Sequence, residues 1–139
     1  MIYFNGDGIP DLVTVGQPVD FLRGRGDGTF TSPIHYSTSG SGQTSVATAD
    51  FNGDGKLNVV TADPVAGVIS VLLGSGNGAL LAPINHAAGS LPTPLTIGDF
   101  NGDGRPDVAA AAVGSNAVLV LLNDGSWLPH PPTPPAVSI

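Results

Sequence analysis

The chain has 139 residues, of which 41% are hydrophobic, so it is long enough for one domain with its own core. Its formal net charge is −7 and it holds only four basic residues, which argues against nucleic acid as a partner. The 20 glycines, 13 prolines and exclusive use of Asp as the acidic residue disfavour long helices and favour short strands joined by tight turns.

Cysteine is absent, so neither disulfides nor thiolate metal sites are available. No apolar stretch approaches the roughly 20 residues needed to span a bilayer, and we expect no membrane insertion. The first residues contain no basic segment followed by an apolar one, so no signal peptide is expected in this chain.

One nine-residue motif occurs three times along the chain. Its shared asparagines, Asn5, Asn52 and Asn101, lie 47 and then 49 residues apart. The copies read YFNGDGIPD, DFNGDGKLN and DFNGDGRPD, at residues 3–11, 50–58 and 99–107. Each copy runs directly into an apolar segment that predicts a β-strand, at residues 12–15, 59–62 and 108–113.

A second element recurs between the motifs. Residues 21–30 align with residues 71–80, and both predict a strand, a Gly-rich turn and a second strand. The tripeptide Arg25-Gly26-Asp27 falls in the first of these turns, so we interpret it as a turn and not as an adhesion motif. A further strand is expected at residues 118–122.

The middle unit therefore predicts four strands, at about 44–49, 58–62, 68–73 and 79–86, as in a blade of a β-propeller. We expect an all-β fold: a partial β-propeller of about three four-stranded antiparallel blades. The first blade would lack its opening strand and the last its closing strand. The expected blades cover residues 1–40, 41–90 and 91–127, followed by a Pro-rich linker or tail at 128–139.

The motif supplies oxygen donors at alternate positions, which is the ligand chemistry that calcium prefers. Its glycines adopt positive φ at little cost and let the chain turn around a small ion. In the third copy the predicted ligands are the side chains of Asp99, Asn101, Asp103 and Asp107 and the carbonyl of Arg105.

The other two copies have fewer carboxylates, and we expect them to bind calcium more weakly. The second copy would use Asp50, Asn52, Asp54, Asn58 and the carbonyl of Lys56. The first copy offers Asn5, Asp7 and Asp11, but Tyr3 stands where the leading Asp belongs. We therefore expect the first site to be impaired.

An EF-hand loop opens in the same way but needs a bidentate Glu at position twelve and flanking helices. Here position twelve is Thr14, Thr61 or Ala110, and the flanks are Val-rich and β-like. The EF-hand interpretation is therefore rejected.

The motif DFNGDGxxD, followed by a strand and then by VLLGxGxG, resembles the FG-GAP/VCBS repeats of integrin-α-type β-propellers. The resemblance covers about residues 3–127. It implies calcium in the loop between the first two strands of each blade, and an extracellular or cell-surface setting that includes cell adhesion. Such blades usually close into a ring with more members than the three found here. We therefore expect a fragment, or a part that assembles with other copies through unpaired blade edges.

No catalytic arrangement stands out, and the chain is not expected to be an enzyme. We predict a calcium-binding structural and interaction module with a protein or glycan partner. One alternative is a lectin, in which Trp127 or Tyr36 stacks on a sugar. Another is an accessory domain of a larger extracellular hydrolase. The three histidines, His35, His86 and His130, are interpreted as polar strand or tail residues, and a zinc site is not expected.

Overall fold

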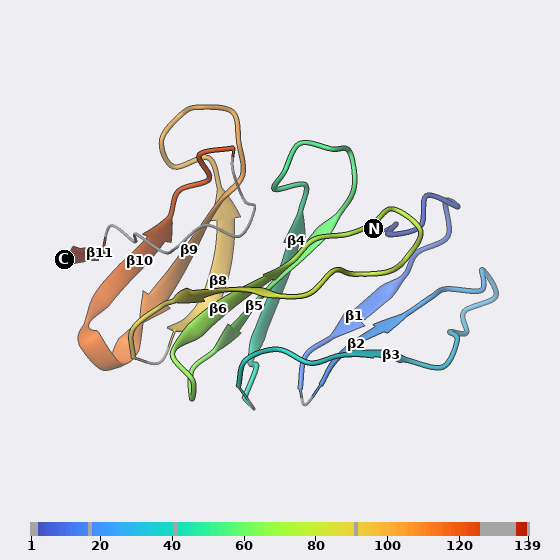
Figure 1. The fold of residues 1–139 in the computed structure, drawn as a ribbon, viewed down its shortest axis with the longest axis horizontal. Helices are drawn as coiled ribbons and strands as arrows, with labels where there is room; N and C mark the ends of the chain where they lie inside the picture. The colour runs from blue at the N-terminus through green and yellow to red at the C-terminus, as the bar shows by residue number, and fades with distance from the viewer. Residues whose placement is uncertain (1–2, 17, 41, 91, 126–135, 139) are drawn as a thin grey trace.

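The computed structural model describes residues 3–16, 18–40, 42–90, 92–125 and, for the backbone alone, 136–138. These residues form three antiparallel sheets that lie side by side, with the middle sheet between the other two (Figure 1). The only helical segment among them is a single 3-10 turn, η1 (Val113–Ser115). The all-β, partial propeller-like fold is confirmed, and no helix in the described part of the chain could cross a membrane.

The first sheet has three strands in the order β1-β2-β3. They are β1 (Leu12–Thr14), β2 (Val19–Leu22) and β3 (Ile34–Tyr36). Strand β1 pairs with β2 alone, so the sheet has no strand ahead of β1 in the described residues, as expected for a blade that lacks its opening strand.

The middle sheet is a complete four-stranded blade in the order β4-β5-β6-β7. Its strands are β4 (Ser45–Ala49), β5 (Asn58–Asp63), β6 (Val68–Leu72) and β7 (Ile84–Ala87). The first three agree closely with the prediction. The fourth begins at Ile84 and not at residue 79, because Pro83 has no N–H to donate to a ladder. Before it, Leu80 makes only an isolated bridge to Gly74.

The third sheet corrects one expectation. Its strands are β8 (Pro92–Gly98), β9 (Asp107–Ala112), β10 (Ala117–Leu121) and β11 (Ala136–Ser138). The prediction that the last blade lacks its closing strand was wrong, because β11 pairs antiparallel with β10. These three residues lie within the segment 128–139, for which we expected a Pro-rich linker or tail. They follow the last proline, so their N–H groups are free to pair with the open edge of β10.

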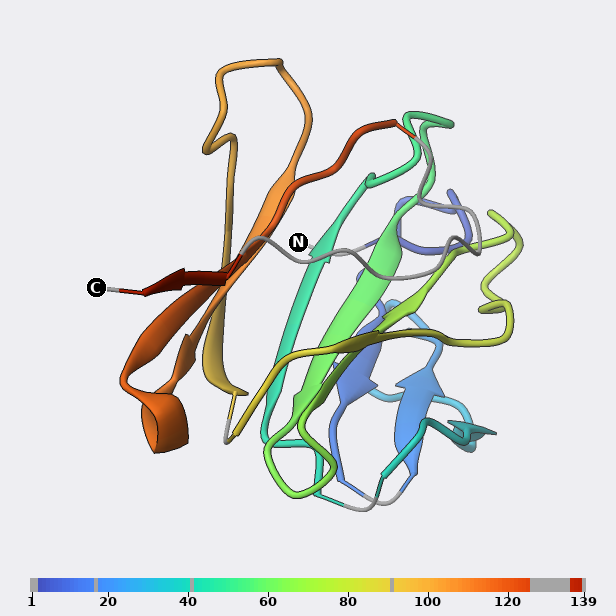
Figure 2. The ribbon, with the colours of Figure 1, turned by 60° about the vertical axis from the view of Figure 1, so that its left-hand side comes forward.

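The hydrophobic core lies in two layers, one between each pair of neighbouring sheets. Phe4 and Phe21 of the first sheet region pack against Val59, Leu72 and Leu80 of the middle sheet region. On the other side of the middle sheet, which faces the third sheet (Figure 2), a larger cluster combines residues of both sheets. The buried members of that cluster are Phe51, Val60, Ala62, Ile69, Val71, Leu73, Ala88, Val108, Ala110, Leu119 and Leu121. Alternate residues of the middle strands therefore point into different layers.

The phenylalanine of the repeated motif shows how each sheet depends on the next one. Phe4 and Phe51 are 4% and 1% exposed, because the following sheet covers each ring. Phe100, at the same place in the third copy, is 49% exposed. The same residue type in the same motif thus has a large or a small packing role according to whether another sheet follows.

This contrast predicts a difference between two identical substitutions. Phe51→Ala should lower the free energy of unfolding by about 3–5 kcal/mol, because it empties a closed part of the core. Phe100→Ala should cost less than about 1 kcal/mol, because half of that ring already meets water. Chemical denaturation of the two variants at low protein concentration measures both values, and equal losses would contradict the layered core.

Candidate calcium loops

The three copies of the motif occupy equivalent places in the three sheets. Residues 50–58 connect β4 to β5, and residues 99–107 connect β8 to β9. Residues 3–11 precede β1, which is the counterpart of β5 and β9. The structure therefore places the loops between the first and second strands of a blade, and each loop enters the strand through its ninth residue.

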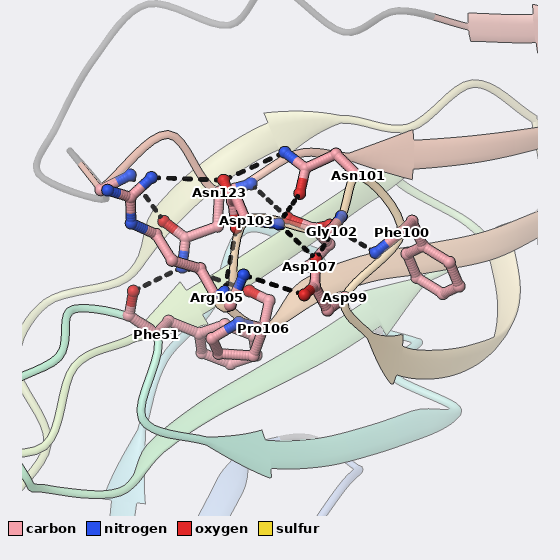
Figure 3. A network of polar contacts seen from close by, with 12 residues as sticks. Phe51, Asp99, Phe100, Asn101, Gly102, Asp103, Arg105, Pro106, Asp107 and Asn123 are labelled. Atoms are coloured by element: carbon pink, nitrogen blue, oxygen red, sulfur yellow. Dashed lines mark hydrogen bonds and ion pairs between the residues drawn. The ribbon is translucent and has the colours of Figure 1, made fainter.

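The leading aspartate organises the loop by accepting backbone hydrogen bonds. Asp99 Oδ1 accepts from the N–H groups of Gly102 at 2.7 Å and Asp103 at 3.0 Å, and Oδ2 accepts from Gly104 at 2.9 Å (Figure 3). Asp50 makes the same three bonds in the second copy, at 2.8, 3.2 and 2.7 Å. These N–H groups converge on one carboxylate because the glycines of the turn have positive φ.

The fifth residue of the motif ties the middle of the loop to its end. Asp103 Oδ1 accepts from the Arg105 N–H at 2.9 Å, and Oδ2 accepts from Asn101 Nδ2 and Arg105 Nη1. The backbone bond from Arg105, followed by the Asn101 amide, holds the pKa of Asp103 below its ordinary value. The stability that this carboxylate contributes is therefore present above about pH 4 and lost as the pH falls through the lowered pKa.

The ninth residue is buried and joins the loop to the neighbouring turn. Asp107 is fully buried, and its Oδ2 accepts the Phe100 N–H at 2.8 Å while its Oδ1 accepts the Asn123 N–H at 2.7 Å. Asp11 does the same in the first copy, with Phe4 and Gly24 as donors. One carboxylate thus connects the start of the loop to the turn that follows the second strand after the loop, β2 or β10.

The second copy has an amide at this position, and the amide makes only one of the two hydrogen bonds. Asn58 Oδ1 accepts the Phe51 N–H at 2.8 Å, but the buried Nδ2 has no hydrogen-bond partner. Gly74 stands where Gly24 and Asn123 stand in the other copies, and a Cβ added to it would lie 3.9 Å from this Nδ2. By equivalence with Gly24 and Asn123, whose N–H groups donate to a carboxylate, the Gly74 N–H faces an amide donor in the second copy.

The first copy keeps part of the arrangement without its leading aspartate. Asn5 Oδ1 still accepts from Asp7 N–H at 3.1 Å, and Asp7 Oδ1 accepts from Ile9 N–H at 2.7 Å. Tyr3 cannot provide the carboxylate that accepts three backbone N–H groups in the other copies, and of the three equivalent donors the Asp7 N–H is accepted by Asn5 Oδ1 instead. The first turn of this loop therefore lacks the shared carboxylate that Asp50 and Asp99 supply.

The donor set fits a hard cation in its chemistry, since every predicted ligand is an oxygen. Asn52 Oδ1, a predicted ligand, is buried and has no hydrogen-bond partner, so a cation would satisfy it. The carboxylates of the third copy instead accept backbone N–H groups, and within the described residues no three acidic or histidine side chains gather as a metal cluster. The bonded oxygens keep a second lone pair, which leaves capacity for a cation.

Asn123 is a site residue that the sequence analysis missed. It is fully buried, and its Nδ2 donates to the Phe51 carbonyl at 2.5 Å and to the Pro106 carbonyl at 3.2 Å. It therefore links the loop of the second copy to the loop of the third. The available signal was the repeat alignment, in which Asn123 replaces the glycines Gly24 and Gly74.

The remaining candidate residues have roles within the fold or lie outside the described part. His35 Nδ1 pairs with Asp20 Oδ1 at 2.7 Å across β2 and β3, and burial lowers the pKa of His86. The Tyr36 hydroxyl accepts the Leu80 N–H at 3.0 Å between two sheets, which gives this ring a packing role. Trp127 and His130 lie outside the described residues.

Comparison with protein families gives a clear result. A family described as FG-GAP-like repeat matches residues 4–61 and again residues 50–110. The first match covers residues 4–11 of the first loop and all of the second, and the second match covers the last two loops, so each match runs from one copy of the motif to the next. Comparison with curated proteins and with solved structures gave no match.

Asn58 and Asp107 occupy the same position in two copies of the motif. Exchanging the residue type at each should change the free energy of unfolding in opposite directions. Asn58→Asp should raise the free energy of unfolding by about 1 kcal/mol, because the new oxygen would accept the Gly74 N–H. Asp107→Asn should lower it by about 1–3 kcal/mol, because an amide donor would then face the Asn123 N–H. Urea denaturation in EDTA measures both, and a destabilised Asn58→Asp variant would contradict the assigned role of the ninth residue.

Proposed function

Because this chain belongs to the FG-GAP-like repeat family, a family of structural and interaction repeats, we propose that it is a calcium-binding scaffold module. The observation that carries the proposal is the buried, partnerless Asn52 Oδ1 in a loop whose other predicted ligands are also oxygens. Calcium held in the loops would offset the repulsion between carboxylates that lie on the same short turn.

The ligands we propose are those of the motif. The third loop would bind through Asp99, Asn101, Asp103, Asp107 and the carbonyl of Arg105, and the second through Asp50, Asn52, Asp54, Asn58 and the carbonyl of Lys56. The third loop has three carboxylates and the second has two, so we expect the third to bind more tightly. Asn5, Asp7 and Asp11 would form a weaker site, because Tyr3 replaces the leading carboxylate.

The proposed role is recognition and not catalysis. Repeats of this family are typically non-catalytic. The loop aspartates also accept one or more backbone hydrogen bonds each, so they already have a role in the shape of the loop. We propose that the module presents its surface to a protein or glycan partner. We place it outside the cell or at the cell surface, the common setting of the family.

Calcium should stabilise the chain, and the stabilisation should increase with the logarithm of its affinity for the loops. At a free concentration about 100 times the Kd, a single site raises the free energy of unfolding by about 2.7 kcal/mol. Asp103→Asn should weaken the third site by at least about tenfold, because it removes one of three carboxylates but keeps an oxygen for the Arg105 N–H.

Asp27→Asn is the matched control, because it makes the same change of charge in a hairpin turn outside the loops. Calorimetric titration and thermal melting of the apoprotein and both variants provide the measurement. Absence of any calcium effect on the unchanged chain, or an equal loss in Asp27→Asn, would overturn the proposal.

The first loop offers a gain-of-function test. Tyr3→Asp should supply the missing acceptor for the first turn and raise the calcium stoichiometry by one strong site. Tyr3→Asn is the control, because it supplies an oxygen without the charge and should bind more weakly. If Tyr3→Asp leaves the stoichiometry and the melting temperature in calcium unchanged, the leading residue does not have the role assigned to it.

A further inference from the structure

The two outer faces of the three-sheet array carry residues that elsewhere in the chain are covered by a neighbouring sheet. We call the outward side of the third sheet the tail face; it consists of Thr96, Phe100, Ala111, Val118 and Val120. We call the outward side of the first sheet the head face; it consists of Leu12, Thr14, Asp20, Leu22 and His35. Strand pairing and the alternation of side chains along each strand assign these residues.

The tail face matches a buried face of the middle sheet, residue for residue. By the pairing of β9 with β10 and of β5 with β6, Val118 and Val120 are the counterparts of Ile69 and Val71. Ile69 and Val71 are 0% exposed because the third sheet covers them. Val118 and Val120 are only partly buried. In addition, Phe100 is the counterpart of the enclosed Phe51, and it remains half exposed.

The head face matches the opposite buried face of the middle sheet. Leu12 and Leu22 are the counterparts of Val59 and Leu72, which are both 0% exposed where the first sheet covers them. Leu12 itself is 39% exposed. The head face and the tail face are therefore the two halves of one interface, which already forms twice inside the chain.

We propose that the head face of one copy of this chain docks on the tail face of a second copy, and so repeats the internal contact between sheets. The proposed contact joins the same kinds of face as the two contacts on either side of the middle sheet. Each copy carries one head face and one tail face, so it can make the contact at both ends. The tail face contains no ionisable residue, so covering it removes no charge from water. Unlike the calcium proposal, this contact involves the sheets and not the loops.

The polar residues of the head face fit such a contact. Asp20 pairs with His35 where the middle sheet pairs Ser70 with Asn85, at 2.7 Å in both cases. Ser70 is buried, and Asn85, at the exposed margin of the contact, donates to Ser39 Oγ of the preceding blade at 2.6 Å. A polar pair at this position is thus already compatible with a covering sheet, provided that each member has a partner.

A contact between two different faces is heterologous, so it produces a closed ring or an open filament according to the rotation between copies. It also makes a prediction that an isologous dimer does not make. A thiol on the head face should react with a thiol on the tail face, but two thiols on the same face should remain apart.

The experiment uses two single-cysteine variants, since the chain has no cysteine of its own. Leu12→Cys labels the head face and Val120→Cys labels the tail face. A short bismaleimide crosslinker is added to each variant alone and to an equimolar mixture, in calcium and in EDTA. We expect a dominant crosslinked heterodimer in the mixture under both conditions, and little product from either variant alone.

Light scattering of the unlabelled chain gives an independent measurement. The mass should exceed the 13.9 kDa of one chain, and Ala111→Arg on the tail face should return it to that value. Val65→Arg is the control, because Val65 is 77% exposed in a turn outside both faces and should leave the mass unchanged. A monomeric chain, or crosslinks confined to single-variant samples, would overturn the inference without affecting the calcium proposal.

Discussion

The arrangement of this chain depends on one buried hydrogen-bonding point in each repeat, the ninth residue of the motif. Its side chain accepts a backbone N–H from the second residue of the loop and, in two of the copies, another from the turn that follows the second strand after the loop. A buried carboxylate is stable only when its oxygens are satisfied, so the residue holds both segments in place. With that point fixed, the phenylalanine beside it is directed at the next sheet, and the core layers follow.

Hydrogen bonds within each loop add to this fixed point. Asp50 and Asp99 gather three N–H groups each, and the fifth residue closes the end of the loop. The residues that we propose as calcium ligands are therefore also the residues that shape the loop. In this design the metal would reinforce an existing turn, so its removal would loosen the loops more than it would disturb the sheets.

Much of this organisation could be predicted from the sequence, because the same residues at the same spacing favour the same local structure in each copy. Three motifs in register, each leading into an apolar run, were enough to predict the sheets and the position of the loops. The closing strand at 136–138 could not be predicted, because its pairing with β10 is a long-range event and the prolines before it indicate an extended segment. Asn123 was missed for a related reason: its side chain donates a hydrogen bond to the Phe51 carbonyl, 72 positions away in sequence.

The coverage of the middle sheet on both sides has a consequence for cooperativity. In an array of units that contact only their neighbours, stability is approximately the sum of the units and the contacts between them. Within a single copy, opening either outer sheet breaks one contact between sheets, whereas opening the middle sheet breaks two. In the single copy the amide protons of β5 and β6 should therefore exchange last with solvent, and unfolding should begin at the outer sheets.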